Sequence, residues 1–447
     1  MAIVILIIIF FASRFYKLMA MPLFLDETLY IRWLNTIHQS GDWLLPLKEF
    51  GWEPLNIWIA AVINLLAKDS LLSLRLTAIL FGLLTLICLF LALKQILKPK
   101  IVYLILFTYL ISPVILLYDR LGLRGDSAVS FCFSLALLGL VQRLIQKKPF
   151  AGYLISLAII LGLLIKTTAI MIPLIVLISF IVFKQKPTKT DAKALGLTTL
   201  PLIFYYFTHT LSLVLNKSSV FLNTGVTMIK NNLYQQLLWL YQYLTWPVVV
   251  LFFVGLFLLF KQQKKLFKLL LISLLTTFIF MALTAKILFP RYILLSFMSA
   301  LIIAGYGLSQ IFTQLPRILK PLTVVFLIPA LILSFSLIRD LKSAQLPEIE
   351  RWQYVTGWQA GYALNDLVAY LKTDAPQILV TEDNDLIKSG LLYLWPEHPF
   401  IITQTATASA YFVSNINNQL PDNLTGRLIK EFPRPENKSA IRLWQLE

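Results

Sequence analysis

Long runs of apolar residues, separated by short charged connections, fill most of the chain before Asp340. Several runs hold about 17 to 22 residues, enough for one helix to cross a hydrocarbon core of roughly 30 Å. They are apolar throughout, whereas the strands of a membrane barrel alternate between apolar and polar positions. The pattern predicts about eleven transmembrane helices. They are expected near residues 2–13, 72–93, 101–118, 127–142, 150–165, 167–183, 194–215, 246–260, 266–285, 292–312 and 321–338.

The first run, MAIVILIIIFFASRFYKL, could also be read as a secretory signal sequence. No Lys or Arg precedes its apolar part, and nothing like A-x-A follows, so the pattern favours an uncleaved anchor. Both cysteines, Cys88 and Cys132, fall inside predicted spans. The external regions therefore have no disulfide, which favours a prokaryotic plasma membrane over a secretory-pathway ectodomain.

Composition excludes a soluble protein, because the 447 residues are 58% hydrophobic and 14% charged, with a mean hydropathy of +0.77. The net charge of +17 could indicate a nucleic-acid partner. However, the basic residues cluster in every second connection, and the positive-inside rule assigns such connections to the cytoplasm. This predicts a cytoplasmic N-terminus, with the first connection and everything after Ile338 on the outer face. The basic residues concerned are Lys94, Lys98 and Lys100; Arg143, Lys147 and Lys148; Lys184, Lys186, Lys189 and Lys193; Lys261, Lys264, Lys265 and Lys268; and Arg317 and Lys320.

The chain changes character near Asp340, after which acidic residues are frequent and no apolar run is long enough to span. WQAGYALNDLVAYLKTDA has helical spacing, and QILVTEDND reads as a short buried strand. LLYLW, FIITQTA, AYFVSNI and IRLWQL alternate or are rich in β-formers. We therefore expect residues 1–338 to form one all-α transmembrane domain and residues 339–447 a small external α/β domain.

The large first external loop, about residues 13–71, carries most of the acids that precede Asp340. Asp26 and Glu27 stand side by side in FLDETLY, directly after the first span. Charge close to lipid is costly, so adjacent carboxylates there indicate proton or cation chemistry. GWEPLNIWIAAVINLLA is too short to cross and predicts an interfacial helix. The alternative is a solvated connector with ordinary surface acids.

Basic side chains mark the later external turns. The second external loop, YDRLGLRGDSAV, is dense in charge, although its Arg and Asp residues could simply pair with one another. Lys166 lies between two apolar runs, and AKILFPRY contains Lys286 and Arg291. No acidic residue occurs between Ala192 and Arg339, so a lipid phosphate would satisfy Lys286 and Arg291. Snorkelling at helix ends is the alternative.

Six segments, taken in order, resemble the GT-C glycosyltransferases, and most closely the dolichyl-phosphate-mannose protein mannosyltransferase and aminoarabinose transferase-like group. The segments are FLDETLY, WEPLNIWIAAV, RLTAILFGLLTLICLFLAL, ISPVILLYDRLGLRGD, LGLLIKTTAIMIPL and PRYILLSFMSALIIAGYG. The resemblance covers the whole chain in order. It implies inverting transfer of a sugar from a polyprenyl-phosphate donor to a lipid, glycan or protein acceptor on the outer face.

The resemblance also implies roles for individual acids. Asp26 would be the general base that deprotonates the acceptor hydroxyl, and Glu27 would support it. Arg120 and Asp126 would line the same cavity. In WEPL, Glu53 stands where some relatives carry a Lys, which leaves the identity of the donor sugar open.

The cations receive roles from the same resemblance. Arg291 and Tyr292 match an element near the donor phosphate, and Lys166 matches a recurrent Lys at a helix start. Together with Lys286 they would bind the phosphate. A phosphate leaving group needs no protonating acid, so one base and several cations could suffice. No cofactor is expected, although Asp26 with Asp126 could hold a divalent ion.

One motif argues for a different chemistry. Asp383, Asn384 and Asp385 form the D-x-D pattern of nucleotide-sugar transferases, but the tail is small and lacks a Gly-rich phosphate turn, so we interpret the pattern as accidental. A transporter or flippase of lipid-linked sugars is the main alternative function. Such proteins typically have broken helices and internal pseudo-symmetry, which the sequence does not show. A non-catalytic scaffold would leave the acid pair without a purpose.

Overall fold

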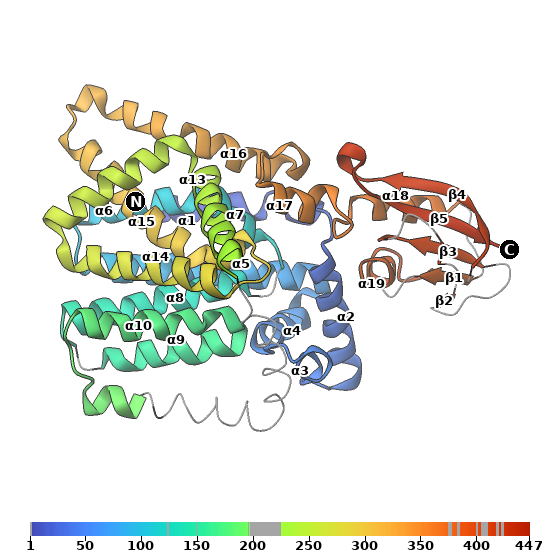
Figure 1. Ribbon diagram of the computed structural model, residues 1–447, viewed down its shortest axis with the longest axis horizontal. Helices are drawn as coiled ribbons and strands as arrows, with labels where there is room; N and C mark the ends of the chain where they lie inside the picture. Colours follow the sequence, from blue (N-terminus) through green and yellow to red (C-terminus); the bar gives the residue numbers. More distant parts are fainter. Residues whose placement is uncertain are drawn as a thin grey trace.

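A computed structural model describes residues 2–447 except 123–124, 149, 195, 197–224, 374–377, 382–384, 399–400, 404–409, 417–419 and 422–423. The predicted span near 194–215 lies almost entirely outside the described residues, as do Asp383 and Asn384. Long helices gather into a bundle, and a twisted sheet lies beyond one end of it (Figure 1). The expected helical membrane bundle with a small C-terminal α/β unit is confirmed at this level.

Ten of the predicted spans coincide with apolar helices, but their lengths differ from the expectation. Among the described residues, six helices are long and apolar enough to cross a membrane, and a bent pair gives a seventh. The count of about eleven crossings therefore stays a prediction. The bundle helices are α1 (Ala2–Phe15), α5 (Ser70–Leu93), α6 (Pro99–Leu110), α7 (Pro113–Arg120), α8 (Asp126–Leu140), α9 (Ala151–Ile165), α10 (Met171–Val182), α13 (Val226–Gln262), α14 (Lys264–Thr284), α15 (Leu294–Gln314) and α16 (Ile328–Arg339).

The bent pair corrects one predicted element. The run at 101–118 was expected to be a single helix, but α6 and α7 meet at an angle of 64°. Ser112, between them, has an extended backbone with ψ of 127°. Pro113 causes the break, because it has no N–H to donate and disfavours helical geometry in the residue before it.

The basic connections meet at one end of the bundle. Arg143 pairs with Asp191 at 2.8 Å, and the Gln146 side-chain amide donates to the carbonyl of Gln95 at 3.2 Å. At the other end of α5, the Tyr393 hydroxyl of the C-terminal domain donates to Asp69 at 3.1 Å. The C-terminal domain and the basic connections therefore lie at opposite ends of α5.

The C-terminal domain is a five-stranded mixed sheet with strand order β2-β1-β3-β5-β4. Strand β1 runs parallel to β2 and β3, whereas β5 is antiparallel to β3 and β4. The strands are β1 (Ile378–Thr381), β2 (Ile401–Thr403), β3 (Tyr411–Ser414), β4 (Gly426–Pro433) and β5 (Ala440–Leu446), and the helices are α18 (Tyr362–Leu371) and α19 (Asp385–Leu394). LLYLW, read as β-rich, instead ends helix α19. Short apolar runs do not distinguish strand from helix, and Ile387 and Leu391, one turn apart, are both buried.

The segment predicted to form the first external loop is helical and packs against the C-terminal domain. Its helices are α2 (Leu25–Ser40), α3 (Leu45–Phe50) and α4 (Leu55–Ala67). Trp33 and Leu34 of α2 share one buried apolar core with Leu364 of α18 and Leu391 of α19. Figure 1 shows α2 and α19 side by side between the bundle and the sheet. Burial of this shared core fixes the domain over the start of α2.

Helices α13 and α15 approach so closely that their backbones touch. A Cβ atom added at Gly255 would overlap the carbonyl oxygen of Ile303, and one at Gly307 would overlap that of Leu251. We expect Gly255→Ala to lower the free energy of unfolding by about 1–3 kcal/mol, because rigid backbone must move apart. Thermal unfolding in detergent measures the change. Gly196→Ala is the control, because no described residue lies within 4 Å of the new methyl, and it should not lower the free energy of unfolding.

Candidate active site

Helix α2 begins immediately before the two adjacent acids. Phe24 is extended, and its N–H donates to Glu27 at 3.2 Å, which satisfies a backbone donor at the helix start. Acidic residues in a first turn also interact favourably with the helix dipole. Asp26 is half-buried, and its carboxylate makes no hydrogen bond or ion pair within the described part of the chain. The neighbouring acids therefore have different environments.

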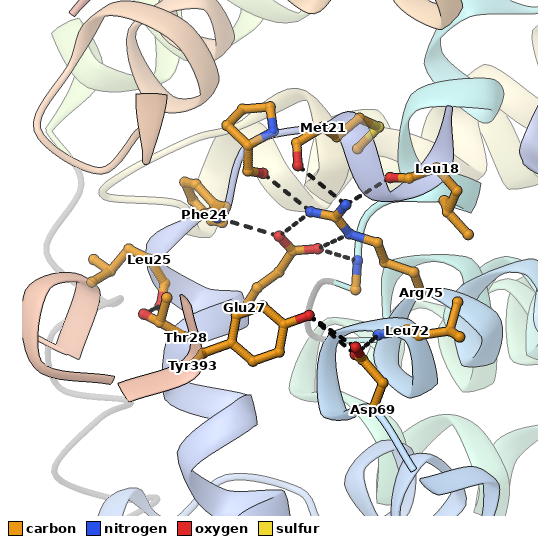
Figure 2. Close-up of polar contacts among 12 residues, drawn as sticks. Leu18, Met21, Phe24, Leu25, Glu27, Thr28, Asp69, Leu72, Arg75 and Tyr393 are labelled. Carbon is orange, nitrogen blue, oxygen red and sulfur yellow. Dashed lines mark hydrogen bonds and ion pairs between the residues drawn. The ribbon is translucent and has the colours of Figure 1, made fainter. Parts of the chain in front are cut away.

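Glu27 is enclosed by donors, as Figure 2 shows. Arg75 of α5 donates from Nε at 2.9 Å and from a terminal nitrogen at 2.8 Å, and the N–H of Gly122 donates at 3.0 Å. Both charged side chains are fully buried. Arg75 also donates to the carbonyls of Leu18 and Pro22 at 2.7 and 3.1 Å. Glu27 thus ties the first loop to α5, and its oxygens are committed to these contacts.

Asp126 and Lys166 form a second buried ion pair. Asp126 is the first residue of α8, and Lys166 directly follows α9. They meet because Gly125 has a positive φ of 70° and lies against Ile165, where a Cβ atom would overlap the isoleucine side chain. The second oxygen of Asp126 is buried without a hydrogen-bond partner among the described residues. One edge of this carboxylate is therefore available to a ligand or water.

Arg291 lies at the start of the short turn that precedes α15. One terminal nitrogen donates to the side-chain oxygen of Gln353 at 3.1 Å and to the hydroxyl of Tyr354 at 3.2 Å. The guanidinium lies 4.5 Å from the ring centroid of Phe289 and 5.6 Å from that of Tyr292. Its other nitrogens have no hydrogen-bond partner in the described part of the chain. Arg291 is thus held on one side and open on the other.

Five of the residues singled out from the sequence come together. The charges of Asp26 and Asp126 both act on Arg291, and the Lys166 ammonium lies 5.4 Å from the ring centroid of Tyr292. We call Asp26, Asp126, Lys166, Arg291 and Tyr292 the polar cluster. Glu53 reaches its edge, since it accepts a hydrogen bond from Thr167, next to Lys166.

Arg120 and Lys286 lie apart from the polar cluster. Arg120 is buried and donates to the carbonyls of Tyr16 and Leu337 at 2.7 and 3.3 Å, so it joins α1 and α16. Lys286 is exposed after α14, with no ion pair among the described residues. Asp119 pairs with Arg14 of α1 at 3.0 Å, and among the described residues it makes no ion pair with the adjacent Arg120.

Sequence reasoning missed three residues near the polar cluster, Glu350, Gln353 and Tyr354. Glu350 belongs to α17 (Glu348–Arg351), and the other two to the π-helical turn Trp352–Thr356. A single π-helical turn has no repeating apolar pattern, so periodicity could not reveal it. The local signal was the aromatic run WQYVTGW, which directly follows the charged residues Glu348, Glu350 and Arg351.

The absence of a metal cofactor remains a prediction from the sequence, with a divalent ion at Asp26 and Asp126 as the alternative. Among the described residues, no group of three or more His, Cys, Asp or Glu side chains lies together. Lys166 already neutralises Asp126, so a divalent ion at Asp26 and Asp126 would have to displace the ammonium or share the second oxygen. Metal-independent chemistry therefore stays our prediction.

The two adjacent acids should differ in their effect on stability. Glu27→Gln leaves the buried Arg75 without its counter-charge, so we expect the free energy of unfolding to fall by roughly 3–5 kcal/mol. Asp26→Asn has the same polar shape and no partner to lose, and should leave unfolding unchanged. Thermal unfolding of both purified variants in one detergent tests this. Equal melting temperatures would show that the Glu27–Arg75 pair does not hold the loop.

Glu350 should make stability depend on pH. Its side chain is 0% exposed, and both carboxyl oxygens lack a hydrogen-bond partner among the described residues. Burial raises the pKa of the Glu350 carboxyl well above 4.5. The folded chain then keeps a proton that the unfolded chain releases, so stability is full below about pH 4.5 and falls as pH rises toward the raised value. Glu350→Gln should be more stable than the wild type at pH 7–8, with the difference vanishing near pH 4.

Urea unfolding across this pH range measures the difference. The control is Glu348→Gln, which replaces an exposed acid of the same helix and should follow the wild-type curve. A Glu350→Gln curve parallel to that of the wild type would mean that Glu350 is ionised in the folded protein.

Comparison with known proteins matches both the sequence and the fold. The family model described as dolichyl-phosphate-mannose-protein mannosyltransferase matches residues 53–209. The structure of ArnT from Cupriavidus metallidurans bound to undecaprenyl phosphate aligns with a TM-score of 0.64 at 13% identity, covering 99% of this chain and 97% of that one. ArnT in the apo state aligns over the same shares with a TM-score of 0.59 at 13% identity. No curated protein matches the chain.

The segment matched by the family model holds three members of the site region, Glu53, Asp126 and Lys166, while the structural match extends over nearly the whole chain. The fold of ArnT thus accounts for the bundle and for the C-terminal sheet domain together. These two matches confirm the resemblance read from the sequence, and they identify the chain as a glycosyltransferase similar to the dolichyl-phosphate-mannose-protein mannosyltransferases.

Proposed function

We propose that the chain transfers a sugar from a polyprenyl-phosphate donor to a hydroxyl of a lipid, glycan or protein acceptor, with inversion at the anomeric carbon. The carrying observation is that Asp26, an unpaired carboxylate among the described residues, lies within electrostatic range of Arg291. A base for the acceptor and a cation for the departing phosphate are thus combined in one cluster.

In the proposed reaction Asp26 takes the proton of the acceptor hydroxyl as its oxygen attacks the anomeric carbon. The bond from that carbon to the phosphate oxygen breaks, and its electron pair leaves with the phosphate. The open nitrogens of Arg291 then stabilise the additional negative charge, as a guanidinium does for phosphates. Lys166 adds positive charge beside Tyr292 and holds Asp126 in place.

The relatives support the choice of donor. The matched family is described by a dolichyl-phosphate sugar, and one of the ArnT structures contains undecaprenyl phosphate. Both molecules are polyprenyl phosphates, which suits an anion site next to a membrane bundle. Glu53, at the edge of the polar cluster, is a candidate for contacting the donor sugar or the acceptor.

The proposed location is a plasma membrane, with the basic connections in the cytoplasm and the polar cluster and C-terminal domain on the outer face. The clustering of the basic connections at one end of the bundle supports this orientation, since the positive-inside rule requires them to share a side. A polyprenyl-linked donor would then reach Asp26 from the outer leaflet.

Asp26→Asn should lower sugar transfer by about 10²- to 10⁴-fold, the usual contribution of a general base. The measurement uses purified protein in lipid nanodiscs with radiolabelled polyprenyl-phosphate hexoses or pentoses, and counts label moved to the acceptor and free sugar released. Asp42→Asn, which changes a half-buried acid of the same loop that pairs with Lys48 at 2.8 Å, is the matched control and should retain full activity.

The same variants separate the enzyme from a flippase. Movement of intact donor between the leaflets of proteoliposomes, without cleavage of the sugar–phosphate bond, would favour transport. Undiminished transfer by Asp26→Asn would exclude Asp26 as the base.

A further inference from the structure

The segment that joins the bundle to the C-terminal domain contacts Arg291 and the residues on either side of Asp26. We call residues 348–361 the connector; it contains α17, the π-helical turn and a return to α18. The π-helical turn is closed by the Gly357 N–H, which donates to the carbonyl of Trp352 at 2.7 Å. Such turns recur at functional sites because the extra residue redirects neighbouring side chains.

On one side the connector holds Arg291. Gln353 and Tyr354 offer two acceptors to the same terminal nitrogen, at 3.1 and 3.2 Å, and are themselves almost fully buried. This pair of acceptors fixes the rotation of the guanidinium and leaves its opposite edge without a partner among the described residues. The connector therefore decides which nitrogens of Arg291 remain for a phosphate.

On its other side the connector holds the start of α2, where Asp26 lies. The N–H of Leu25 donates to the carbonyl of Gln359 at 3.1 Å, and the N–H of Gly361 donates to the carbonyl of Leu23 at 2.9 Å. The rings of Phe24 and Tyr354 pack edge to face, with centroids 4.9 Å apart. One short segment is thus fastened to residues on either side of Asp26 and to Arg291.

The C-terminal domain holds the connector through hydrogen bonds to its backbone carbonyls. Arg434, which is buried, donates to the carbonyl of Ala360 at 2.6 Å and to that of Trp358 at 3.2 Å. Ser439 donates to the carbonyl of Thr356 at 2.6 Å. These bonds engage backbone carbonyls, so they hold the course of the connector whatever its side chains are.

We propose that the connector sets the position of Arg291 relative to Asp26, with Gln353 and Tyr354 as positioning residues and Arg434 as the residue that locks the connector in place. This inference deepens the proposed function and rests on it, because the use of the spacing is to seat a donor phosphate opposite the base. In this proposal Gln353 and Tyr354 do not contact the reacting atoms. They act through Arg291.

The first test removes the acceptors while keeping side-chain shape. Tyr354→Phe preserves the ring packed on Phe24, and Gln353→Met preserves length. Each should raise the donor KM by about three- to ten-fold, the effect of losing one hydrogen bond, with kcat at saturating donor within two-fold of wild type. The double variant should be less than additive in free energy, because both residues bind one nitrogen.

The second test substitutes a residue that lies away from the polar cluster. Arg434→Met should raise the donor KM in the same way, although it lies on the far side of the connector. Arg427→Met, an exposed arginine of the same domain, is the control and should behave as wild type. Unfolding curves verify that each variant is folded before its kinetics are compared.

A measurement without donor separates this inference from the proposed function. The rate at which phenylglyoxal modifies Arg291, followed by mass spectrometry of its peptide, should rise at least three-fold in Tyr354→Phe and Gln353→Met. Faster modification in these variants, with no sugar transfer by the wild type from any donor, would keep the positioning role and reject the proposed function. Unchanged modification, or an unchanged donor KM in an active enzyme, would overturn the inference.

Discussion

The ion pair between Glu27 and Arg75 is the constraint on which the site depends. It lies at the junction of the first loop, α5 and the loop before α8, and every hydrogen-bonding group it carries is engaged. Two charges taken out of water are costly, and the surrounding carbonyl and N–H groups make this pair tolerable. Its position one residue after Asp26 explains the adjacency of the acids. Glu27 is buried in the ion pair, and this holds Asp26 at a fixed place on the first turn of α2.

Three buried arginines perform three different tasks around this constraint. Arg75 neutralises Glu27, Arg14 neutralises Asp119, and Arg120 satisfies carbonyls of α1 and α16. Arg75 and Arg14 each direct Nε and a terminal nitrogen to a carboxylate. Arg120 donates from both terminal nitrogens to carbonyls, while its buried Nε has no partner among the described residues. Arg291 differs because its acceptors gather on one nitrogen. The proposed binding of a phosphate by Arg291 therefore rests on the distribution of its partners, since burial is similar in all four arginines.

Sequence reasoning reached the bundle and the sheet domain through apolar run length, and it reached Asp26, Asp126, Lys166 and Arg291 through the rarity of charge. Tyr292 came from the family resemblance alone. The choice of partners lay beyond it. Nothing local indicates that Glu27 pairs with Arg75, or that Asp119 prefers Arg14 to its neighbour Arg120, since these contacts depend on helix packing. LLYLW was misread as a strand because five consecutive apolar residues fit both the helical and the strand repeat. Gln353 and Tyr354 were missed because a π-helical turn leaves no repeat.

The connector also links residues that are synthesised at very different times. Tyr354 packs on Phe24, which lies about 330 residues earlier in the chain. Synthesis proceeds at roughly 5–20 residues per second, so Phe24 is made well before Tyr354. Asp26 and Arg291 are therefore both synthesised before the connector, which contacts Arg291 and the residues on either side of Asp26. Until the connector and Arg434 have been synthesised and folded, the contacts that we propose to set the position of Arg291 cannot form. In the proposed role, the polar cluster takes its final arrangement only after β4 and β5, which flank Arg434, have been synthesised.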